Sequence, residues 1–273
     1  MMLNNVVLKT LRDKRRAMIG WLLVMTGMSL IYALYWPYIR DNPFMAQMMV
    51  SYLQSFPSGL IEAFIGSNLM LFTTHPEAFL DSELFFLFVP LAFILFTASF
   101  GSDAIAGEED RGTLNLLLSN PVSRSRVVLE KFIALVVYTV LLGALLETEL
   151  VVASVATNTS IDLFRLTDVT LSVILLSLVF GSMALALGCI GLGPSMSTGV
   201  AVSLGVVSYF VNSLATTFRD LQPYRKYSPF FYYIQADPLM NGLNIGDATV
   251  LLVLTVVTLS IALLAFRRRD VSV

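Results

Sequence analysis

The chain of 273 residues contains one cysteine, Cys189, and one histidine, His75. A single cysteine excludes a disulfide within the chain, and a single histidine argues against a histidine-rich metal site. Charged residues make up only 13% of the sequence, against about 25% in an ordinary soluble domain. The motif G-x-x-x-x-G-K-(S/T) is also absent, so the chain has no phosphate-binding loop of that type for ATP. We therefore expect no catalytic residues, no metal and no cofactor in this chain.

Apolar residues, by contrast, make up 56% of the sequence and gather in long runs. Crossing the hydrocarbon core takes about 20 mostly apolar residues, in a helix whose backbone groups bond within the segment. We expect an all-α membrane protein with one transmembrane domain over residues 1–273. The predicted spans are about 17–36, 83–100, 131–156, 168–190, 196–217 and 247–266.

Lysine and arginine are distributed unevenly between the two sides that these spans define. The side of the N-terminus, which includes segments 1–16 and 101–130, carries Lys9, Arg12, Lys14, Arg15, Arg16, Arg111, Arg124, Arg126, Lys131, Arg267, Arg268 and Arg269. The other side, with segments 37–82 and 218–246, carries Arg40, Arg165, Arg219, Arg225 and Lys226. Because basic loops stay in the cytoplasm, both termini and segment 101–130 are predicted to be cytoplasmic. Segment 1–16 is either an interfacial segment or a simple basic flank.

Segment 101–130 is an unusually polar stretch between two apolar spans. Its charged residues include Asp103, Glu108, Glu109, Asp110, Arg111, Arg124, Arg126 and Glu130. We expect residues 101–107 to turn the chain out of the membrane. A helix that begins near Glu108 would be stabilised by the acidic residues in its first turn, since a helix N-terminus carries partial positive charge.

Three leucines predict how this helix packs. Leu114, Leu117 and Leu118 are spaced so that they share one helix face. Pro121 is expected to stop the helix, and Ser123 to cap the helix that continues into the third span. The result is a cytoplasmic helix-turn-helix with one apolar and one charged face. It serves either as a docking element for another protein or as a re-entry loop whose charges meet water and lipid phosphates.

The residues of this segment resemble the signature of type-2 ABC transporter permeases. Ile105 to Leu114 reads IAGEEDRGTL, and it is followed by three leucines at 116–118 and by PVSR at 121–124. The usual form of the signature is I-A-G-E-(E/K)-(E/D)-R-G-T-L, then a leucine-rich turn and P-(V/I)-(S/T)-R. Asp110 stands where glutamate is commoner, which keeps the charge. The basic N-terminal segment, the six spans and the long first outer loop agree with that family.

The resemblance implies that the segment docks on a separate ATPase subunit. Two ATPase subunits, which bind ATP and Mg²⁺, would pair with two permease subunits, this chain and an identical or sister chain. Closure of the ATPase subunits would drive hydrophobic or amphipathic cargo outward across the cell membrane of a prokaryote. The resemblance implies no nucleic-acid partner. The coupling residues it implies are Gly107, Glu108, Glu109, Asp110, Arg111, Gly112, Thr113, Leu114, Leu117 and Leu118. A turn around Gly188–Ser197 would supply a second, weaker contact.

Two acidic residues, Glu147 and Glu149, lie within the third span. A charge at the bilayer centre costs on the order of 2.5–3.5 kcal/mol, so such residues usually face protein or water. One interpretation is that they line the translocation path. The other is that they lie near the outer interface, solvated or paired with a residue such as Arg165. Being two positions apart on a helix, they cannot share one face.

Two other classes of function remain as alternatives to a permease. An intramembrane enzyme needs clustered Ser/His, Asp/Asp or His/Glu groups on facing helices, which one histidine and the lack of an internal aspartate in the spans disfavour. An ion-driven secondary transporter would show inverted repeats or broken helices with internal charges, and neither stands out.

Overall fold

The computed structural model describes residues 6–56, 61, 73, 75–119, 122–215, 217–235 and 237–269. This described part of the chain is helical and contains no strand. Six helical stretches in it are long and apolar enough to cross a membrane, as the sequence predicted. They are α1 (Val6–Arg40), a helical run over Pro76–Asp110, α9 (Arg124–Ala156), α10 (Leu163–Ile190), α11 (Pro194–Leu214) and α14 (Ile245–Arg268).

The helices begin where polar side chains cap them. Ser123, Asp162 and Asn244 precede α9, α10 and α14, and each side chain accepts a backbone N–H from the first turn that follows. The capping by Ser123 confirms the sequence prediction. At the other end of α10, Gly191 has a φ of +116°, the left-handed conformation that commonly terminates a helix.

The helical run over Pro76–Asp110 differs from the prediction that the chain turns at residues 101–107. Its parts are α5 (Pro76–Leu80), the π-helical η1 (Asp81–Phe85), α6 (Phe88–Ser102), the π-helical η2 (Asp103–Gly107) and α7 (Glu108–Asp110). The expected turn at 101–107 is therefore wrong, and so is a new helix beginning near Glu108.

Gly101 shows why that stretch stays helical. A Cβ atom added there would lie 2.1 Å from the carbonyl oxygen of Gly181 in α10. The glycine therefore allows two helix backbones to approach closely, as small residues do between membrane helices. Gly101 serves packing and does not make a turn.

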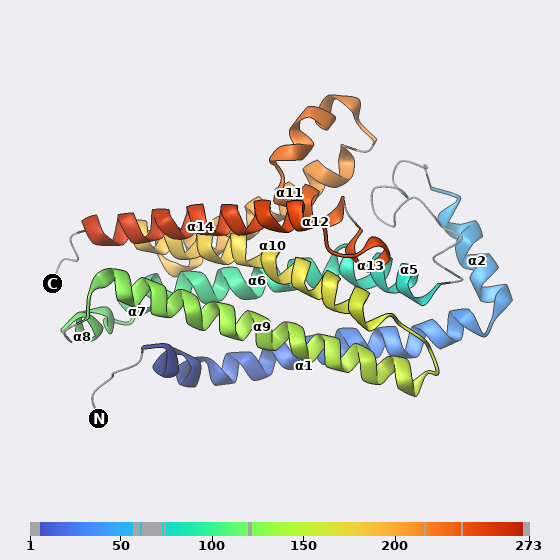
Figure 1. The fold of residues 1–273 in the computed structure, drawn as a ribbon, viewed down its shortest axis with the longest axis horizontal. Helices are drawn as coiled ribbons and strands as arrows, with labels where there is room; N and C mark the ends of the chain where they lie inside the picture. Colours follow the sequence, from blue (N-terminus) through green and yellow to red (C-terminus); the bar gives the residue numbers. More distant parts are fainter. Residues whose placement is uncertain are drawn as a thin grey trace.

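Helix α10 is the centre of the bundle. It packs most extensively against α6 and α14, and it also contacts α9 and α11. Figure 1 shows α10 between α14 and α6, with α9 and α1 on the far side of α6. The largest cluster of buried apolar side chains joins α1, α6, α9 and α10, with members such as Phe93, Leu142 and Phe180. Helix α1 packs mainly on α9.

The short elements separate the two ends of the bundle. Helix α8 (Leu114–Leu118) lies at the same end as the start of α1 and the end of α14. The opposite end carries short elements between the long helices, namely α2 (Pro43–Leu53), η3 (Arg219–Tyr227), α12 (Pro229–Ile234) and α13 (Pro238–Asn241) (Figure 1).

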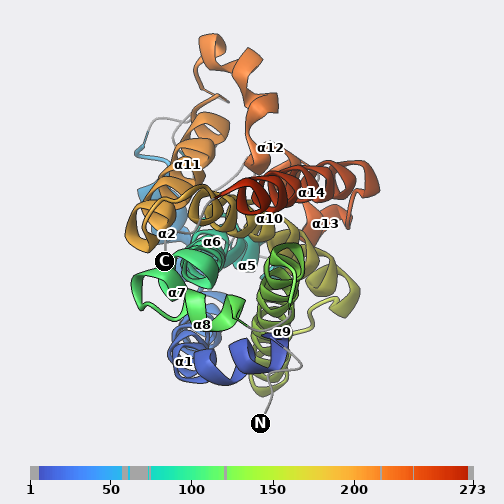
Figure 2. The same cartoon turned by 90° about the vertical axis from the view of Figure 1, so that its left-hand side faces the viewer.

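Residues 6–16 of the predicted interfacial segment form the first turns of α1. Figure 2 shows these turns (dark blue) running across the end of the bundle, below α8. Val6 is buried there, and its N–H donates a hydrogen bond to Oε2 of Glu130 over 2.7 Å. The contact joins the beginning of α1 to the first turns of α9.

Candidate functional site

The turn between α7 and α8 is set by Gly112. Its φ is +69°, and its N–H donates to the carbonyl of Glu109 while the N–H of Thr113 donates to the carbonyl of Glu108. These two hydrogen bonds, over 2.9 and 2.8 Å, are those of a Schellman motif, which ends a helix on a left-handed residue. Glycine adopts this conformation without steric cost, so Gly112 directs the chain from α7 into α8.

A buried ion pair ties α7 to α9. Nζ of Lys131 lies 2.8 Å from Oε1 of Glu108, and the two residues are 3% and 6% exposed. The hydroxyl of Thr113 donates to the second carboxylate oxygen of Glu108. Removing one partner of such a pair would leave a buried charge uncompensated, which is strongly destabilising. Glu108 and Lys131 therefore hold the turn against the start of the third membrane helix.

A second cluster of charges ties the segment to α1. The Asp103 carboxylate forms ion pairs with Lys14 of α1 and with Arg111 of the turn, the latter over 2.8 Å. The hydrogen bond from Arg111 to Asp103 raises the pKa of the guanidinium. Asp103 and Arg111 are eight residues apart in sequence and lie on one side of the η2–α7 helix, so the pair braces the last turns before Gly112.

Arg269 makes a third connection, just after the end of α14. Its guanidinium lies 2.6 Å from Oε1 of Glu109 and donates to the carbonyl of Gly188 over 3.4 Å. The same guanidinium packs beside Gly191, in the turn between α10 and α11. The carbonyl of Arg269 in turn accepts a hydrogen bond from Arg124. Arg269 thus joins the segment to the turn around Gly188–Ser197 that the sequence analysis singled out.

An apolar cluster lies beneath these charges. Its buried members are Val6, Ala104, Ile105, Leu114, Leu117, Val127, Val128, Leu185, Ala186, Cys189, Ala262 and Phe266, and Leu118 packs against it. The shared face of Leu114, Leu117 and Leu118 therefore points into the bundle. The leucine spacing predicted this shared face, and the resemblance left open whether it packs on the bundle or in a groove of an ATPase. Leu116 points the other way and is 70% exposed.

The sequence-predicted coupling residues fall into three groups by exposure. Gly107, Glu108, Leu114 and Leu117 are buried, while Asp110, Arg111 and Gly112 are exposed, and Glu109, Thr113 and Leu118 are intermediate. Asn120 and Pro121 lie outside the described residues, so the expected stop at Pro121 stays a prediction. Figure 2 shows α7 and α8 at the end of the bundle, between α6 and the first turns of α1.

A polar cavity of about 410 Å³ opens between α1 and this segment. Lys9, Lys14, Asp103, Glu108, Arg111 and Lys131 are among its lining residues. Apart from Lys9, these side chains belong to the ion pairs described above. The charged side of the turn faces this cavity next to α1, while the leucines face the apolar cluster.

Glu147 and Glu149 lie away from this site and contact different helices. Glu149 accepts hydrogen bonds from Thr26 and Ser29 of α1, over 2.5 and 3.0 Å. Glu147 accepts one from Thr167 of α10, over 2.6 Å. Neither forms an ion pair with a residue that the structure describes, Arg165 included. Both carboxylates therefore link α9 to its neighbours, and they do so from opposite sides of the helix.

Several residues of the site were not among the predicted coupling residues, and they differ in how far a sequence could reveal them. Asp103 is eight residues from Arg111, a helical spacing that places both on one side of a continuous helix. Leu116 does not belong to the helix face that Leu114, Leu117 and Leu118 share, so the apolar periodicity places it on the outer side of α8. Lys14, Lys131 and Arg269 come from other helices, and no local pattern marks them as partners.

The chain was compared with known protein families and with curated proteins. The family described as ABC-2 family transporter protein matches residues 4–271, nearly the whole chain. The match takes in all six long helices as well as the segment with α7 and α8. No curated protein matches the sequence.

Proposed function

The chain belongs to the ABC-2 transporter family, and we propose from this that it is the permease subunit of an ATP-driven exporter, coupled to a separate ATPase. As a member, it is a multi-pass membrane component of an ABC transport system and not itself the catalytic subunit. The proposal adds the direction of transport and the segment through which the ATPase acts on the permease. The ATPase would act on the segment from Asp103 to Leu118, which we call the coupling segment.

The observation that carries the proposal is the set of charged contacts around the coupling segment. Lys14 connects it to α1, Lys131 to α9, and Arg269 to the end of α14. A force on α8 would therefore act on three membrane helices through ion pairs, and on α6 through the continuous helix. Rigid helices joined by such contacts move as units when a partner rotates or pushes them. The arrangement would transmit a movement of the ATPase to the helices of the bundle.

The exposed side of the coupling segment is where the ATPase would bind. Asp110, Arg111, Asn115 and Leu116 are exposed there, and Leu116 is an apolar side chain in a polar surround. The fully buried centre of an interface is more apolar than its rim, and arginine is enriched in interfaces. We assign docking to these residues and assign the buried Glu108, Leu114 and Leu117 to holding the segment in place.

The rest of the assembly follows the family resemblance. Two permease subunits, identical or sister chains, would pair with two ATPase subunits that bind ATP and Mg²⁺. Both termini and the coupling segment would lie in the cytoplasm of a prokaryote, because most lysine and arginine residues lie on that side. The cargo would be hydrophobic or amphipathic and would leave the cell along a path between the permease subunits.

Co-purification of the ATPase from the native host, followed by ATP hydrolysis, tests this proposal. Leu116→Asp places a negative charge at the centre of the proposed contact. Arg111→Glu reverses the charge of a side chain at the rim of that contact. We expect Leu116→Asp to release an ATPase that co-purifies with the parent chain. The matched control is Tyr227→Asp, an exposed side chain at the opposite end of the molecule. Full retention of the ATPase by both coupling variants would overturn the docking assignment.

A further inference from the structure

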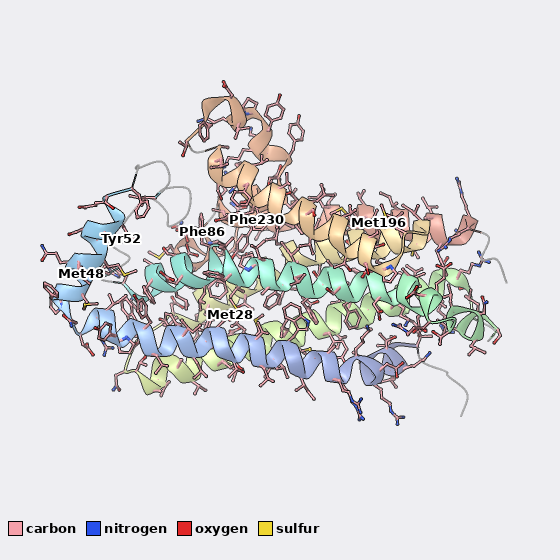
Figure 3. The ribbon with its side chains drawn as sticks, turned by 180° about the vertical axis from the view of Figure 1, so that it is seen from behind. Met28, Met48, Tyr52, Phe86, Met196 and Phe230 are labelled. Carbon is pink, nitrogen blue, oxygen red and sulfur yellow. The ribbon has the colours of Figure 1, made fainter. Side chains whose placement is uncertain are left out.

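A groove of about 250 Å³ lies between α1 and the helical run that contains α5, η1 and α6. Its lining residues are Met28, Ile31, Tyr32, Tyr35, Phe79, Glu83, Leu84 and Phe88. Figure 3 shows Met28 in the seam between α1 and α6. The groove is separate from the coupling segment, because it lies toward the start of the second helical run and not toward its end at Asp110.

Aromatic rings form much of the groove wall. Tyr32 and Phe79 are buried and form its floor, while Tyr35 and Phe88 are exposed at its rim. The ring centroid of Phe79 lies 5.8 Å from that of Tyr32 and 6.1 Å from that of Tyr35. Aromatic faces carry partial negative charge and attract cations, more strongly when water is excluded. A cage of this kind favours a positively charged ligand over a neutral one.

Glu83 adds a full negative charge to this wall. No lysine or arginine lines the groove, and Glu83 forms no hydrogen bond or ion pair with any residue in the described ranges. An acidic side chain within a membrane bundle is costly unless it meets a partner or water. Glu83 also lies on the π-helical η1, and π-helical turns occur frequently at functional sites.

The hydroxyl of Tyr32 is a second polar group without a partner. Tyr32 is only 2% exposed, and within the described part of the chain its hydroxyl has no hydrogen-bond partner. Buried hydroxyl groups are normally hydrogen-bonded, so each exception needs an explanation. Tyr32 lines the groove beside Phe79. Because its oxygen is buried, a small rotation of the ring on binding would let a ligand in the groove supply the missing partner.

We propose that this groove binds an amphipathic organic ammonium ion. The ammonium group would donate to the Glu83 carboxylate and to the Tyr32 oxygen, with the rings of Tyr35 and Phe88 over its charge. An apolar body would follow Met28, Ile31 and Leu84. The inference rests on the proposed export function, because it names the class of cargo that such a permease would take up.

The negative charge of Glu83 favours an ammonium ion over the other ligands that an apolar groove can bind. A lipid acyl chain would fill the apolar part and leave Glu83 and the Tyr32 hydroxyl without partners. A fatty acid would bring a carboxylate next to Glu83, where like charges repel. An alkylammonium ion satisfies both polar groups and matches the apolar wall, and the three ligands can be compared at equal chain length.

Binding can be measured through Trp36, whose ring centroid lies 5.2 Å from that of Phe79. The sequence has two tryptophans, so Trp21→Phe leaves Trp36 as the only tryptophan signal. The full chain in lipid nanodiscs is titrated with decylammonium, decanol and decanoate. We expect a saturable change in Trp36 emission with decylammonium, at a concentration on the order of 10-fold lower than for decanol, and no saturable change with decanoate. Equal responses to decylammonium and decanol would show partition into lipid and overturn the proposal.

Variants of the two polar groups complete the test. Glu83→Gln is expected to weaken decylammonium binding about 10-fold or more, since hydrogen bonds to charged groups are the stronger ones. Tyr32→Phe should weaken it about 3-fold and leave decanol binding unchanged. The matched control Asp247→Asn removes a carboxylate from the first turn of α14 and should bind as the parent chain does. Unchanged decylammonium binding by Glu83→Gln would overturn the proposal.

Failure of this inference can be distinguished from failure of the proposed function. ATPase co-purification is measured on the same preparations, and it depends on the coupling segment. If the ATPase stays bound while Glu83→Gln binds decylammonium as tightly as the parent chain, only the groove assignment fails. If no ATPase associates but the ammonium selectivity is found, the groove stands and the export function fails.

Discussion

Lys131 and Glu108 form an ion pair of 2.8 Å that is buried at the junction of α7 and α9. The pair lies one layer beneath the exposed side chains of the coupling segment. Its members come from the last turn of one membrane helix and the first turns of the next. The position of the segment is therefore fixed from inside the bundle, and its outer face stays exposed.

Glu108→Gln should destabilise the chain strongly because it leaves the Lys131 ammonium buried without a counter-charge. The expected loss is about 3–5 kcal/mol for a fully buried pair. The double variant Glu108→Gln/Lys131→Met should recover much of this loss, since no charge then remains buried. Thermal unfolding of the two single variants and the double variant gives the coupling energy. Strictly additive effects would show that the two side chains do not interact.

Gly112→Ala should destabilise the turn between α7 and α8 through the backbone alone. The glycine has a φ of +69°, and a Cβ atom there would meet no other atom within 4 Å. An L-residue in the left-handed conformation costs about 1–2 kcal/mol. Thermal unfolding together with ATPase co-purification measures the effect. Gly199→Ala, within α11 and also with open space around it, should be neutral or slightly stabilising.

The two glycines Gly101 and Gly112 show what the sequence could and could not reveal about the fold. Both precede or follow polar residues, so local sequence favours a turn at either. At Gly101 the absence of a Cβ atom serves the close approach of α6 to Gly181 in α10, and the helix continues through η2. Such a contact between distant segments leaves no local signal.

The candidate site was predictable to a similar extent. The spacing of Leu114, Leu117 and Leu118 predicted that they share one face of α8, because helix periodicity is a local property. Lys14 and Arg269 are 89 and 160 residues from their acidic partners in sequence. A single sequence shows that both residues are basic and says nothing about which acids they meet. The order of the residues predicted the coupling segment, and the packing of the bundle assigned its contacts.

Glu149→Gln should loosen the contact between α9 and α1. The carboxylate accepts hydrogen bonds from two hydroxyls of α1, Thr26 and Ser29. Hydrogen bonds to charged groups contribute about 1.5–3 kcal/mol, and the amide retains only part of that. We expect a lower melting temperature for Glu149→Gln, and a smaller decrease for Glu147→Gln, which loses one such bond to Thr167.

The same two variants test whether these acids contact cargo. ATP hydrolysis by the assembled complex is measured with and without a transported compound. Loss of the stimulation in Glu147→Gln at unchanged stability would favour a place on the translocation path. Unchanged stimulation and export in both variants would restrict the two residues to linking helices.

Asp237→Asn should stabilise the chain, and its advantage should grow as the pH rises. Asp237 caps α13 in a left-handed conformation with a φ of +45°, and its side chain accepts the N–H of Met240. Burial raises the pKa of this carboxyl, and Asp81 lines the same small cavity of about 130 Å³. A raised pKa in the folded state means that the folded chain holds the proton more tightly than the unfolded chain. Stability is therefore lost as the pH rises from the unfolded value of about 4 through the folded one.

Asparagine keeps the cap and the left-handed conformation but cannot ionise. The melting temperature of Asp237→Asn should therefore exceed that of the parent chain at pH 8, and the difference should shrink toward pH 4. As a control, Asp41→Asn removes an exposed carboxyl whose pKa is lowered by the hydrogen bond from Arg40, so this variant should gain no stability as the pH rises. A constant difference between Asp237→Asn and the parent chain from pH 4 to pH 8 would contradict a raised pKa. It would mean that the Asp237 carboxyl is as well solvated in the folded protein as in the unfolded chain.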